Sequence, residues 1–450
     1  MPEYTTTVGL EIHVELKTRT KMFCNSQNDP HAAEPNTHIC PVCMAYPGTL
    51  PVINKEAVRH VLRVGAALQG TLADYSEFDR KNYFYPDIPK GYQISQYQYP
   101  LVKGGSLAGV AITRVHLEED TARSQHDGEY SLIDFNRAGV PLMELVTEPV
   151  IHDVETAMRF AEELQLLLRT IGASSANMEK GEMRVEANIS VSKTNTLGTK
   201  VEVKNINSFR AVGKAIAYEV TRHIEALERG EVLVQETRGW DDVKEVTFSQ
   251  RLKESSHDYR YFPDPDLPKL RLSRIDEFSL KNIVASLPEL PRQRRARLQA
   301  FGFLQDQDIE QLMNDTDLST FFDQAATELD SPELIKIAAN FILNDVAGER
   351  KKNPAWTLPT AHHLAEVVRK YHEKKLASPQ AKSALLTGVI PEMADTASLQ
   401  NLVHELIATN PVAIGEVKKG KQSAVQYLIG QGMKQSKGSA NPQELEKLLR

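Results

Sequence analysis

The sequence predicts an α+β fold in which a mainly antiparallel sheet is followed by helices. Three observations support this prediction. Residues 1 to about 290 contain short β-like runs separated by turn residues. From residue 292 onward, helix-like segments follow one another with short connections. Between these regions lies a stretch with two prolines, residues 286–291, which is typical of a linker.

The first β-like stretch, Val8 to Leu16, alternates polar and apolar side chains. Glu11, His13 and Glu15 share one side of an extended strand, because successive side chains point to opposite faces. The opposite side carries only aliphatic residues and would pack on a core. A face with two carboxylates and an imidazole can bind a metal ion. A solvated strand face with no function is the alternative.

Further elements follow from local periodicity. We expect strands within 107–115, 131–135 and 200–204, and two helices, 55–68 and 154–171. Asp153 is a candidate N-cap of the second helix, and Gly172 marks its end. In the second half, helices are expected at 292–302, 308–313, 318–329, 332–344 and within 396–450. We therefore predict three domains: residues 1–291, 292–393 and 394–450.

Composition narrows the class of protein. With 450 residues and 41% hydrophobic side chains, the chain is long enough for two to three globular domains. It contains no apolar run near the roughly 20 residues of a membrane span, and its N-terminus has no signal pattern, so we expect a cytoplasmic protein. The net charge of −7 argues against a generally basic nucleic-acid coat. From residue 411 onward, however, seven Lys and Arg outnumber three acidic residues, which indicates either phosphate contacts or a solvated helix face.

Two further acidic positions accompany the first stretch. Glu118, Glu119 and Asp120 follow a strand-like run, and Glu144 lies inside the apolar run 140–146. A lone carboxylate in an apolar run is costly to bury without a partner. Glu11, His13, Glu119 and Glu144 together would form a mostly oxygen ligand set, which hard cations such as Mg²⁺ prefer.

Residues 79–87 and 91–96 are dense in polar and aromatic side chains. Tyr83 and Tyr85 could stack on a nucleobase while Arg80 and Lys81 hold phosphate. A packed aromatic turn is the alternative. Residues 204–209 and 258–266 have the same character. No P-loop or dinucleotide-binding motif occurs in the proper context, so an ATP site would have to be built another way.

The three cysteines lie close together in sequence. Cys40 and Cys43 form a C-x-x-C pair, and Cys24 precedes them. Three thiolates are one short of a closed structural zinc site. Either His31 or His38 supplies the fourth ligand, or the cluster holds no metal.

Together these stretches resemble one family. V-G-L-E-I-H-V-E-L at 8–16, D-R-K-N-Y-F-Y-P-D at 79–87, H-L-E-E-D at 116–120, P-L-M-E-L-V-T-E-P at 141–149 and D-Y-R-Y-F-P-D-P-D-L at 258–267 are similar to the motifs of the B subunits of aspartyl/glutamyl-tRNA amidotransferases, the GatB family. Residues 420–442 resemble that family's C-terminal domain, which YqeY proteins share. The resemblance covers essentially the whole chain.

The resemblance implies a ligase that acts with an amidase partner (GatA) and a small third partner (GatC) as a heterotrimer. Such a chain binds misacylated Glu-tRNA(Gln) or Asp-tRNA(Asn) and phosphorylates the esterified side-chain carboxylate with ATP. Ammonia from the amidase then gives Gln-tRNA(Gln) or Asn-tRNA(Asn). The implied Mg²⁺ ligands are Glu11, His13, Glu119 and Glu144. Candidates for binding ATP or substrate, chosen by residue type, are Arg80, Lys81, Asn82, Tyr83, Tyr85, Gln93, Ser95, Gln96, Arg184, Glu186, Asn188, Lys204, Asn205, Asn207 and Ser208.

The resemblance also implies that the tail contacts the tRNA backbone through Lys418, Lys419, Lys421, Lys434 and Lys437. One departure concerns zinc: related chains with a zinc site carry C-x-C before the C-x-x-C pair, and here Ser26 replaces the second cysteine. Two other functions are alternatives to the ligase. The first is a recognition and scaffold subunit without its own catalysis, and the second is a zinc-dependent protein of nucleic-acid metabolism.

Overall fold

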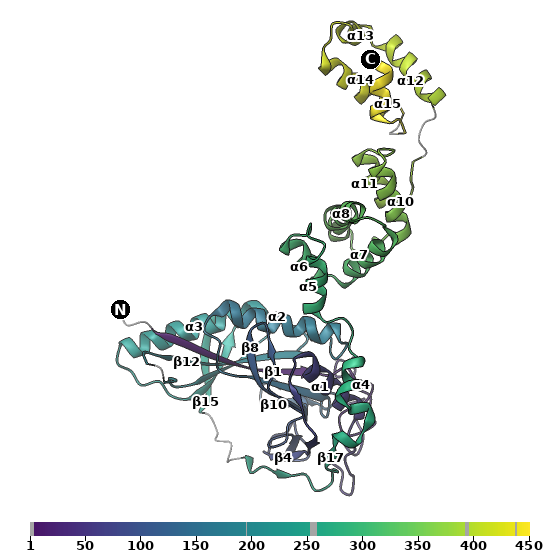
Figure 1. Cartoon of the computed structure of the whole chain (residues 1–450). Coiled ribbons are helices and arrows are strands. Elements are labelled where there is room, and N and C mark those ends of the chain that lie inside the picture. The colour runs from purple at the N-terminus through teal and green to yellow at the C-terminus, as the bar shows by residue number, and fades with distance from the viewer. Residues whose placement is uncertain (1–3, 195, 253–258, 392–395, 437–438) are drawn as a thin grey trace. The chain divides into compact units, whose positions relative to one another are not determined.

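The structure is a computed structural model, and it describes residues 4–194, 196–252, 259–391, 396–436 and 439–450. The chain divides into two compact units, residues 1–291 and 292–450. The first unit contains the sheets, and the second is helical (Figure 1). The predicted α+β class, with a mainly antiparallel sheet followed by helices, is confirmed. The predicted boundary at residues 393 and 394 lies outside the described residues.

Within the described residues, a ten-stranded sheet forms the body of the first unit. Its order is β15-β14-β13-β12-β1-β11-β8-β6-β2, with β7 paired to β8. Its described neighbours are antiparallel except for β13 and β14, which are parallel. The strands are β1 (Thr5–Glu15), β2 (Thr71–Leu72), β6 (Val102–Lys103), β7 (Ser106–Leu107), β8 (Val110–Glu119), β11 (Pro141–Thr147), β12 (Met183–Ser192), β13 (Val201–Ile206), β14 (Glu236–Asp241) and β15 (Val246–Leu252).

Strand β1 lies near the middle of this sheet and confirms the predicted alternation. Its aliphatic side chains Leu10, Ile12 and Val14 are at most 1% exposed. They belong to one hydrophobic core with residues of α1, α2 and α3, and in Figure 1 the long helices α2 and α3 run along one side of the sheet. The polar side chains of β1 are therefore left on the other face. That face carries the site described below.

The three long helices of the first unit begin at side-chain caps. Asn54 caps α1 (Lys55–Ala67), Asp153 caps α2 (Val154–Thr170), and Ser208 caps α3 (Phe209–Glu228). The first two match predicted helices within a residue. Helix α3 was not predicted, although the cap Ser208 and the apolar spacing after it are visible in the sequence. Helix α4 (Leu280–Ala285) and short 3₁₀ turns (Leu272–Arg274, Asp276–Phe278) complete the unit.

One predicted strand divides into a hairpin. The run 107–115 was expected to be continuous, but Ala108 and Gly109 adopt positive φ values of 49° and 84° and form a turn between β7 and β8. A three-stranded sheet has β4 (Asp79–Asn82) in the middle, between β16 (Phe262–Pro263) and β5 (Tyr92–Ser95). Two further sheets pair β17 (Leu270–Arg271) with β3 (Tyr75–Ser76) and β9 (Arg123–Asp127) with β10 (Tyr130–Asp134).

The second unit is helical in its described residues. A π-helical turn (Phe341–Val346) follows α8, so the predicted helix 332–344 is regular only as far as Asn340. Its α-helices are α5 (Pro291–Gln299), α6 (Asp306–Asn314), α7 (Thr316–Glu328), α8 (Pro332–Asn340), α9 (Ala347–Lys352), α10 (Ala361–His372), α11 (Ser378–Thr387), α12 (Thr396–Thr409), α13 (Pro411–Val417), α14 (Gln422–Gln435) and α15 (Pro442–Leu449). Residues of α12, α14 and α15 share a small core of their own. Among the described residues, the helices are all too short or too polar to cross a membrane.

Replacing Ser208 with alanine tests whether this residue is a cap and not a ligand of substrate. Its hydroxyl accepts a hydrogen bond from the backbone N–H of Ala211, at 3.1 Å. We expect Ser208→Ala to lower the free energy of unfolding by about 1 kcal/mol, and the first thermal transition to fall by about 2–4 °C. Ser208→Asp, which retains a capping oxygen, should unfold near the wild-type temperature. An unchanged melting curve for the alanine variant would contradict this role.

Candidate active site

Strand register brings polar side chains from adjacent strands together on the open face of the sheet. His13 on β1 lies opposite Glu144 on β11, and Glu144 lies opposite His116 on β8. On the other side of β1, Glu11 lies opposite Glu186 on β12. Directly opposite residues point to the same face of a sheet. The result is a row of acidic and imidazole groups that runs across the strands.

The centre of the row is a tight group, which we call the carboxylate cluster: Glu11, His13, Glu118 and Glu144. His13 Nε2 lies 3.5 Å from Glu144 Oε2, 3.7 Å from Glu11 Oε1 and 3.8 Å from Glu118 Oε1. His116 closes the group from β8, with its Nε2 at 3.4 Å from Glu144 Oε2 and 3.8 Å from Glu118 Oε2. Glu118 and Glu144 are 3% and 8% exposed, so their charges are largely desolvated.

Protonation in the cluster reflects this crowding. Burial, together with the charges of Glu144 and Glu186, raises the pKa of Glu11 to about 7. Burial opposes the charge on His13, but its hydrogen bond to Glu144 and the surrounding carboxylates raise its pKa to about 9. Burial likewise opposes the charge on Glu144, but His116 and His13 hold its pKa below the usual range. The imidazolium of His13 is therefore one of the positive charges that offset these carboxylates.

The donor set of the cluster fits a hard divalent cation. Atoms of Glu11, His13 and Glu144 lie within 4.8 Å of one another, and so do atoms of His116, Glu118 and Glu144. Three carboxylates with one or two imidazoles form the oxygen-rich environment that Mg²⁺ prefers. Binding would require the protons on Glu11 and His13 to leave, because only the deprotonated groups are ligands.

The structure corrects one predicted ligand: Glu118, and not Glu119, joins the cluster. Neighbouring residues of a strand point to opposite faces, and Glu118 shares the face of His116. Glu119 forms an ion pair with Lys90 and accepts the backbone N–H of Ile94 at 2.9 Å. The sequence H-L-E-E-D contains both glutamates, and only the register against β11 decides between them.

A second acidic group adjoins the cluster through Glu11. Carboxylate oxygens of Glu11, Glu186 and Glu202 lie within 4.8 Å of one another. Lys204 already supplies a positive charge here, with its Nζ at 2.7 Å from Glu186 Oε2 and 3.8 Å from Glu202 Oε2. The negative charge of Glu186 helps to raise the pKa of Lys204 against the effect of burial. Glu186 and Lys204 were predicted from the sequence, but Glu202 was not, because the strands that pair with β13 could not be foreseen.

The two basic residues predicted to hold phosphate, Lys81 and Arg80, have different surroundings. Lys81 lies beside the cluster: burial disfavours its ammonium form, but Tyr261 and the carboxylates Glu118 and Glu144 raise its pKa. Arg80 is already held by two carboxylates. Its guanidinium donates to Asp264 and Asp266 at 2.7 and 2.8 Å and lies over the ring of Tyr92.

Several predicted binding residues support the fold of the site in this structure. Ser95 Oγ donates to Glu118 Oε2 at 3.0 Å, so it positions a cluster residue. The side-chain amides of Gln93 and Gln96 are buried and hydrogen-bonded to Glu119 O and Ser76 Oγ. Asn82 donates to the backbone carbonyls of Tyr259 and Arg260.

The remaining predicted residues lie further along β12 and β13 or directly after β13. Arg184 forms an ion pair with Asp120 at 2.6 Å, and Ser208 caps α3. Asn205 and Asn207 are exposed, and Asn188 Oδ1 is buried without a hydrogen-bond partner among the described residues. Tyr83 and Tyr85 form part of an aromatic group described below.

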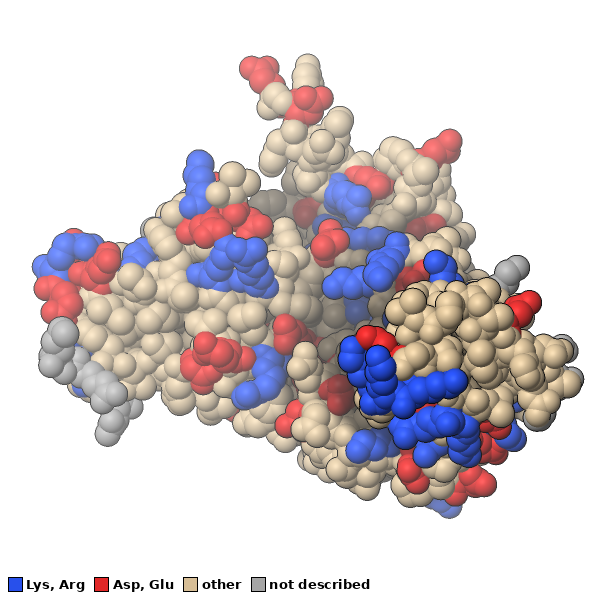
Figure 2. Space-filling model, turned by 90° about the horizontal axis from the view of Figure 1, so that it is seen from above, with Lys and Arg blue, Asp and Glu red and all other residues tan. Residues whose placement is uncertain are grey.

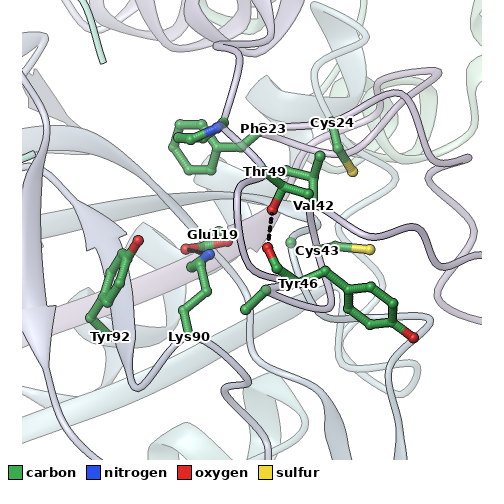
Figure 3. A pocket seen from close by; sticks show the side chains of 12 residues that line it. Phe23, Cys24, Val42, Cys43, Tyr46, Thr49, Lys90, Tyr92 and Glu119 are labelled. Atoms are coloured by element: carbon green, nitrogen blue, oxygen red, sulfur yellow. Dashed lines mark hydrogen bonds and ion pairs between the residues drawn. The ribbon is translucent and has the colours of Figure 1, made fainter. Parts of the chain in front are cut away.

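The cysteines form a separate cluster at a pocket of about 200 Å³. Sγ atoms of Cys24, Cys40 and Cys43 lie within 4.8 Å of one another, and Ser26 Oγ lies 3.9 Å from Cys43 Sγ. In Figure 3, Cys24 and Cys43 line one side of the pocket, and Lys90, Glu119 and Tyr92 line the other. The fully buried Lys21 places its Nζ 3.9 Å from Cys43 Sγ.

Neither histidine predicted as a fourth zinc ligand joins this cysteine cluster. His31 Nε2 lies 3.8 Å from Glu182, and His38 Nε2 lies 4.0 Å from Asp29. Among the described residues, the group of converging metal-ligand atoms here consists of the three thiols and includes neither imidazole. At residue 26, where related chains were expected to carry cysteine, the chain instead places the hydroxyl of Ser26 beside Cys43.

The predicted tail lysines are exposed on the helical second unit. Lys418 and Lys419 lie between α13 and α14, Lys421 pairs with Glu416 at 2.6 Å, and Lys434 lies in the last turn of α14. Lys437 lies outside the described residues. In Figure 2, which views the molecule from above, Lys and Arg side chains gather on the part nearest the viewer.

Comparisons with known proteins identify the family. Residues 6–276 match the model of the GatB/GatE catalytic domain, and residues 320–450 match that of the GatB domain GatB_Yqey. A protein of Thermus thermophilus, named as the B subunit of aspartyl/glutamyl-tRNA(Asn/Gln) amidotransferase, is 44% identical, over 99% of this chain and 98% of that protein. A protein of the same name from Carboxydothermus hydrogenoformans is 41% identical over 100% of this chain and 99% of its own length. The chain belongs to the GatB family.

The choice between Glu118 and Glu119 gives a direct test of the site. We expect Glu118→Gln to weaken Mg²⁺ binding at least about tenfold, because even the residues that only support metal ligands typically contribute 10–100-fold to affinity. Glu119→Gln, its matched neighbour, should change Mg²⁺ affinity by less than about threefold, which is below that range. Isothermal calorimetry with MgCl₂ measures both. Equal losses, or a larger loss for Glu119→Gln, would contradict the assignment.

Proposed function

We propose that this chain is the B subunit of a glutamyl/aspartyl-tRNA amidotransferase. It acts as the ligase component that uses ATP and Mg²⁺ to activate the side-chain carboxylate of misacylated Glu-tRNA(Gln) or Asp-tRNA(Asn). The observation that carries the proposal is the buried carboxylate cluster with Lys81 beside it. Membership of the GatB family, with relatives of that name matched over almost their full length, supports the same reaction.

The chemistry explains why such a site is needed. A carboxylate is a poor acyl donor, because oxide would have to leave. In the proposed reaction, a carboxylate oxygen of the aminoacyl group attacks the γ-phosphorus of ATP, and ADP leaves. Ammonia then attacks the acyl carbon, inorganic phosphate leaves, and the nitrogen loses a proton to give the amide. Phosphoryl transfer of this kind depends mainly on positioning and charge neutralisation.

In this proposal, residues of this chain supply both the positioning and the charge neutralisation. Glu11, His13, Glu118 and Glu144 would hold Mg²⁺, which when bound offsets the negative charge of phosphate oxygens. Ser95 fixes the carboxylate of Glu118, and His116 contacts Glu118 and Glu144, so the ligands are held in place. Lys81 remains protonated beside the cluster and would bind phosphate as a point charge. Lys204, on the other side of Glu11, would add a second positive charge.

The proposal includes partners. Hydrolysis of glutamine needs a glutaminase, and we assign it to the amidase partner (GatA), with the small third partner (GatC) completing a cytoplasmic heterotrimer. The tRNA body would contact the basic tail. A recognition and scaffold subunit without catalysis is the rival function, and a buried acidic cluster with a protonated lysine has no purpose in it.

ADP release by the assembled three-protein enzyme tests the proposal. We expect ADP only with misacylated Glu-tRNA(Gln) or Asp-tRNA(Asn) and Mg²⁺, and not with uncharged tRNA. Glu144→Gln should lower the rate by a factor of about 10²–10³, as expected for loss of a group that stabilises transition-state charge. Its Kd for tRNA should stay within about threefold, since charge at the tail is unchanged. Tight tRNA binding with no ADP from the wild-type enzyme would favour the scaffold function.

The tail assignment predicts a salt-dependent loss of tRNA binding. We expect the double variant Lys418→Ala and Lys419→Ala to raise the Kd for tRNA about tenfold and to reduce the salt slope by roughly 1.5. Lys281→Ala, which removes one exposed charge from the first unit, is the control. Filter binding over a range of KCl concentrations measures both quantities. An unchanged Kd would show that the tail is a solvated helical surface.

We also propose that Cys24, Cys40 and Cys43 hold Zn²⁺, with Ser26 Oγ or a water as the fourth ligand. The convergence of the three thiols and of Ser26 supports it. The purified protein should contain about one zinc per chain. Ser26→Cys should slow its removal by a chelator about tenfold, because a fourth thiolate closes the site. Ser26→Ala is the matched control. Absence of zinc from both the wild type and Ser26→Cys would refute the site.

A further inference from the structure

Five tyrosines form a continuous arc of aromatic rings beside the carboxylate cluster. They come from three segments of the chain: Tyr83 and Tyr85 follow β4, Tyr97 follows β5, and Tyr259 and Tyr261 precede β16. Ring centroids along the arc are 5.9, 6.3, 6.1 and 4.4 Å apart, in the order Tyr85, Tyr83, Tyr259, Tyr261 and Tyr97. The last pair is stacked, with an angle of 10° between the ring planes. We call these five residues the tyrosine arc.

The two ends of the arc are open to solvent, whereas its middle adjoins the site. Tyr85 and Tyr97 are 54% and 51% exposed, and Phe84 beside Tyr85 is 80% exposed. At the middle, Lys81 Nζ lies 4.8 Å from the ring centroid of Tyr259. Burial raises the pKa of Tyr261 to about 12, and the nearby charges of Glu118 and Glu144 act in the same direction. The arc therefore leads from the surface to the cluster.

The arc is held by specific contacts and is not a loose aromatic turn. Asn82 donates to the backbone carbonyls of Tyr259 and Arg260 at 3.1 and 2.9 Å. Arg80 on β4 is paired with Asp264 and Asp266, which follow the arc residues on the third segment. Exposed tyrosines that are fixed in this way lose little entropy when a ligand stacks on them.

Exposed aromatic faces next to a basic group are the chemistry that binds unpaired nucleotides. Bases stack on tyrosine rings, and a lysine ammonium contacts the phosphates between them. The substrate of the proposed reaction has such nucleotides: its amino acid is esterified to the last residue of a single-stranded 3′ end. When the side-chain carboxylate reaches the cluster, the preceding bases must lie at the mouth of the site. The ends of the arc are exposed. They are therefore better suited to a single-stranded RNA end that arrives from solvent than to the adenine of ATP, which would need an enclosed pocket.

We propose that the tyrosine arc binds the unpaired 3′-terminal nucleotides of the aminoacylated tRNA and so guides the esterified carboxylate to the carboxylate cluster. This inference rests on the proposed function, because it takes aminoacyl-tRNA as the substrate. Tyr85 and Tyr97 are the residues that stack on bases, and Tyr83, Tyr259 and Tyr261 hold them around Lys81.

The test uses the assembled three-protein enzyme and tRNA whose terminal adenine is replaced by 2-aminopurine, a base that loses fluorescence when it stacks. We expect wild-type enzyme to quench this fluorescence. Tyr85→Ala and Tyr97→Ala should each remove at least half of the quenching and raise the KM for aminoacyl-tRNA about tenfold, the value of one stacked base. Tyr85→Phe and Tyr97→Phe should behave like wild type, because the rings remain. Tyr130→Ala, at a tyrosine 76% exposed outside the arc, is the control.

The readouts separate this inference from the proposed function. ADP release at saturating aminoacyl-tRNA should persist in the alanine variants, and their KM for ATP should stay within about twofold, well below the loss of one stacked base. A raised KM for ATP with unchanged quenching would overturn the inference, since the arc would then hold the nucleotide. Equal quenching and KM values in all variants would overturn it as well. Absence of ADP from the wild-type enzyme under all conditions would instead contradict the proposed function itself.

Discussion

The first unit depends on keeping several like charges buried side by side on one face of a sheet. Glu118 and Glu144 are desolvated, and leaving either one unpaired in such a place would cost several kcal/mol. His13, His116, Arg114 and Lys81 offset this cost. The arrangement holds only while β8, β11 and β1 keep their register, because a shift by one residue would turn the acidic side chains into the apolar core. The same strand register therefore determines both the fold of the sheet and the geometry of the site.

The parts of the fold and of the site that depend on local sequence patterns could be predicted from the sequence. The alternation in β1, the lone Glu144 in an apolar run and the cap Asp153 each gave a correct element or side-chain direction. Features that depend on contacts between residues far apart in sequence could not be predicted. The choice of Glu118 over Glu119 needed the register of β8 against β11. The ion pairs of Arg80 with Asp264 and Asp266, which lie far away in sequence, were likewise invisible before the structure.

Residues that were not predicted also depend on contacts between distant segments. Glu202 and His116 are ordinary strand residues until neighbouring strands place them beside Glu186 and Glu144. Helix α3 was missed although its cap was visible, because the preceding polar stretch suggested a binding loop. The tyrosines were recognised as unusual, yet their order in space, and the position of Lys81 beside them, came only from the packing of three distant segments.

The central claim is that the carboxylate cluster activates a substrate carboxylate by transferring phosphate to it. Oxygen transfer tests this claim most directly. Glu-tRNA(Gln) whose side-chain carboxylate carries ¹⁸O would be converted by the assembled enzyme with unlabelled ATP, and the inorganic phosphate would be examined by mass spectrometry. If an acyl phosphate forms, one labelled oxygen must leave with phosphate, so each turnover should place one ¹⁸O in the phosphate. Unlabelled phosphate with normal formation of Gln-tRNA(Gln) would contradict the account.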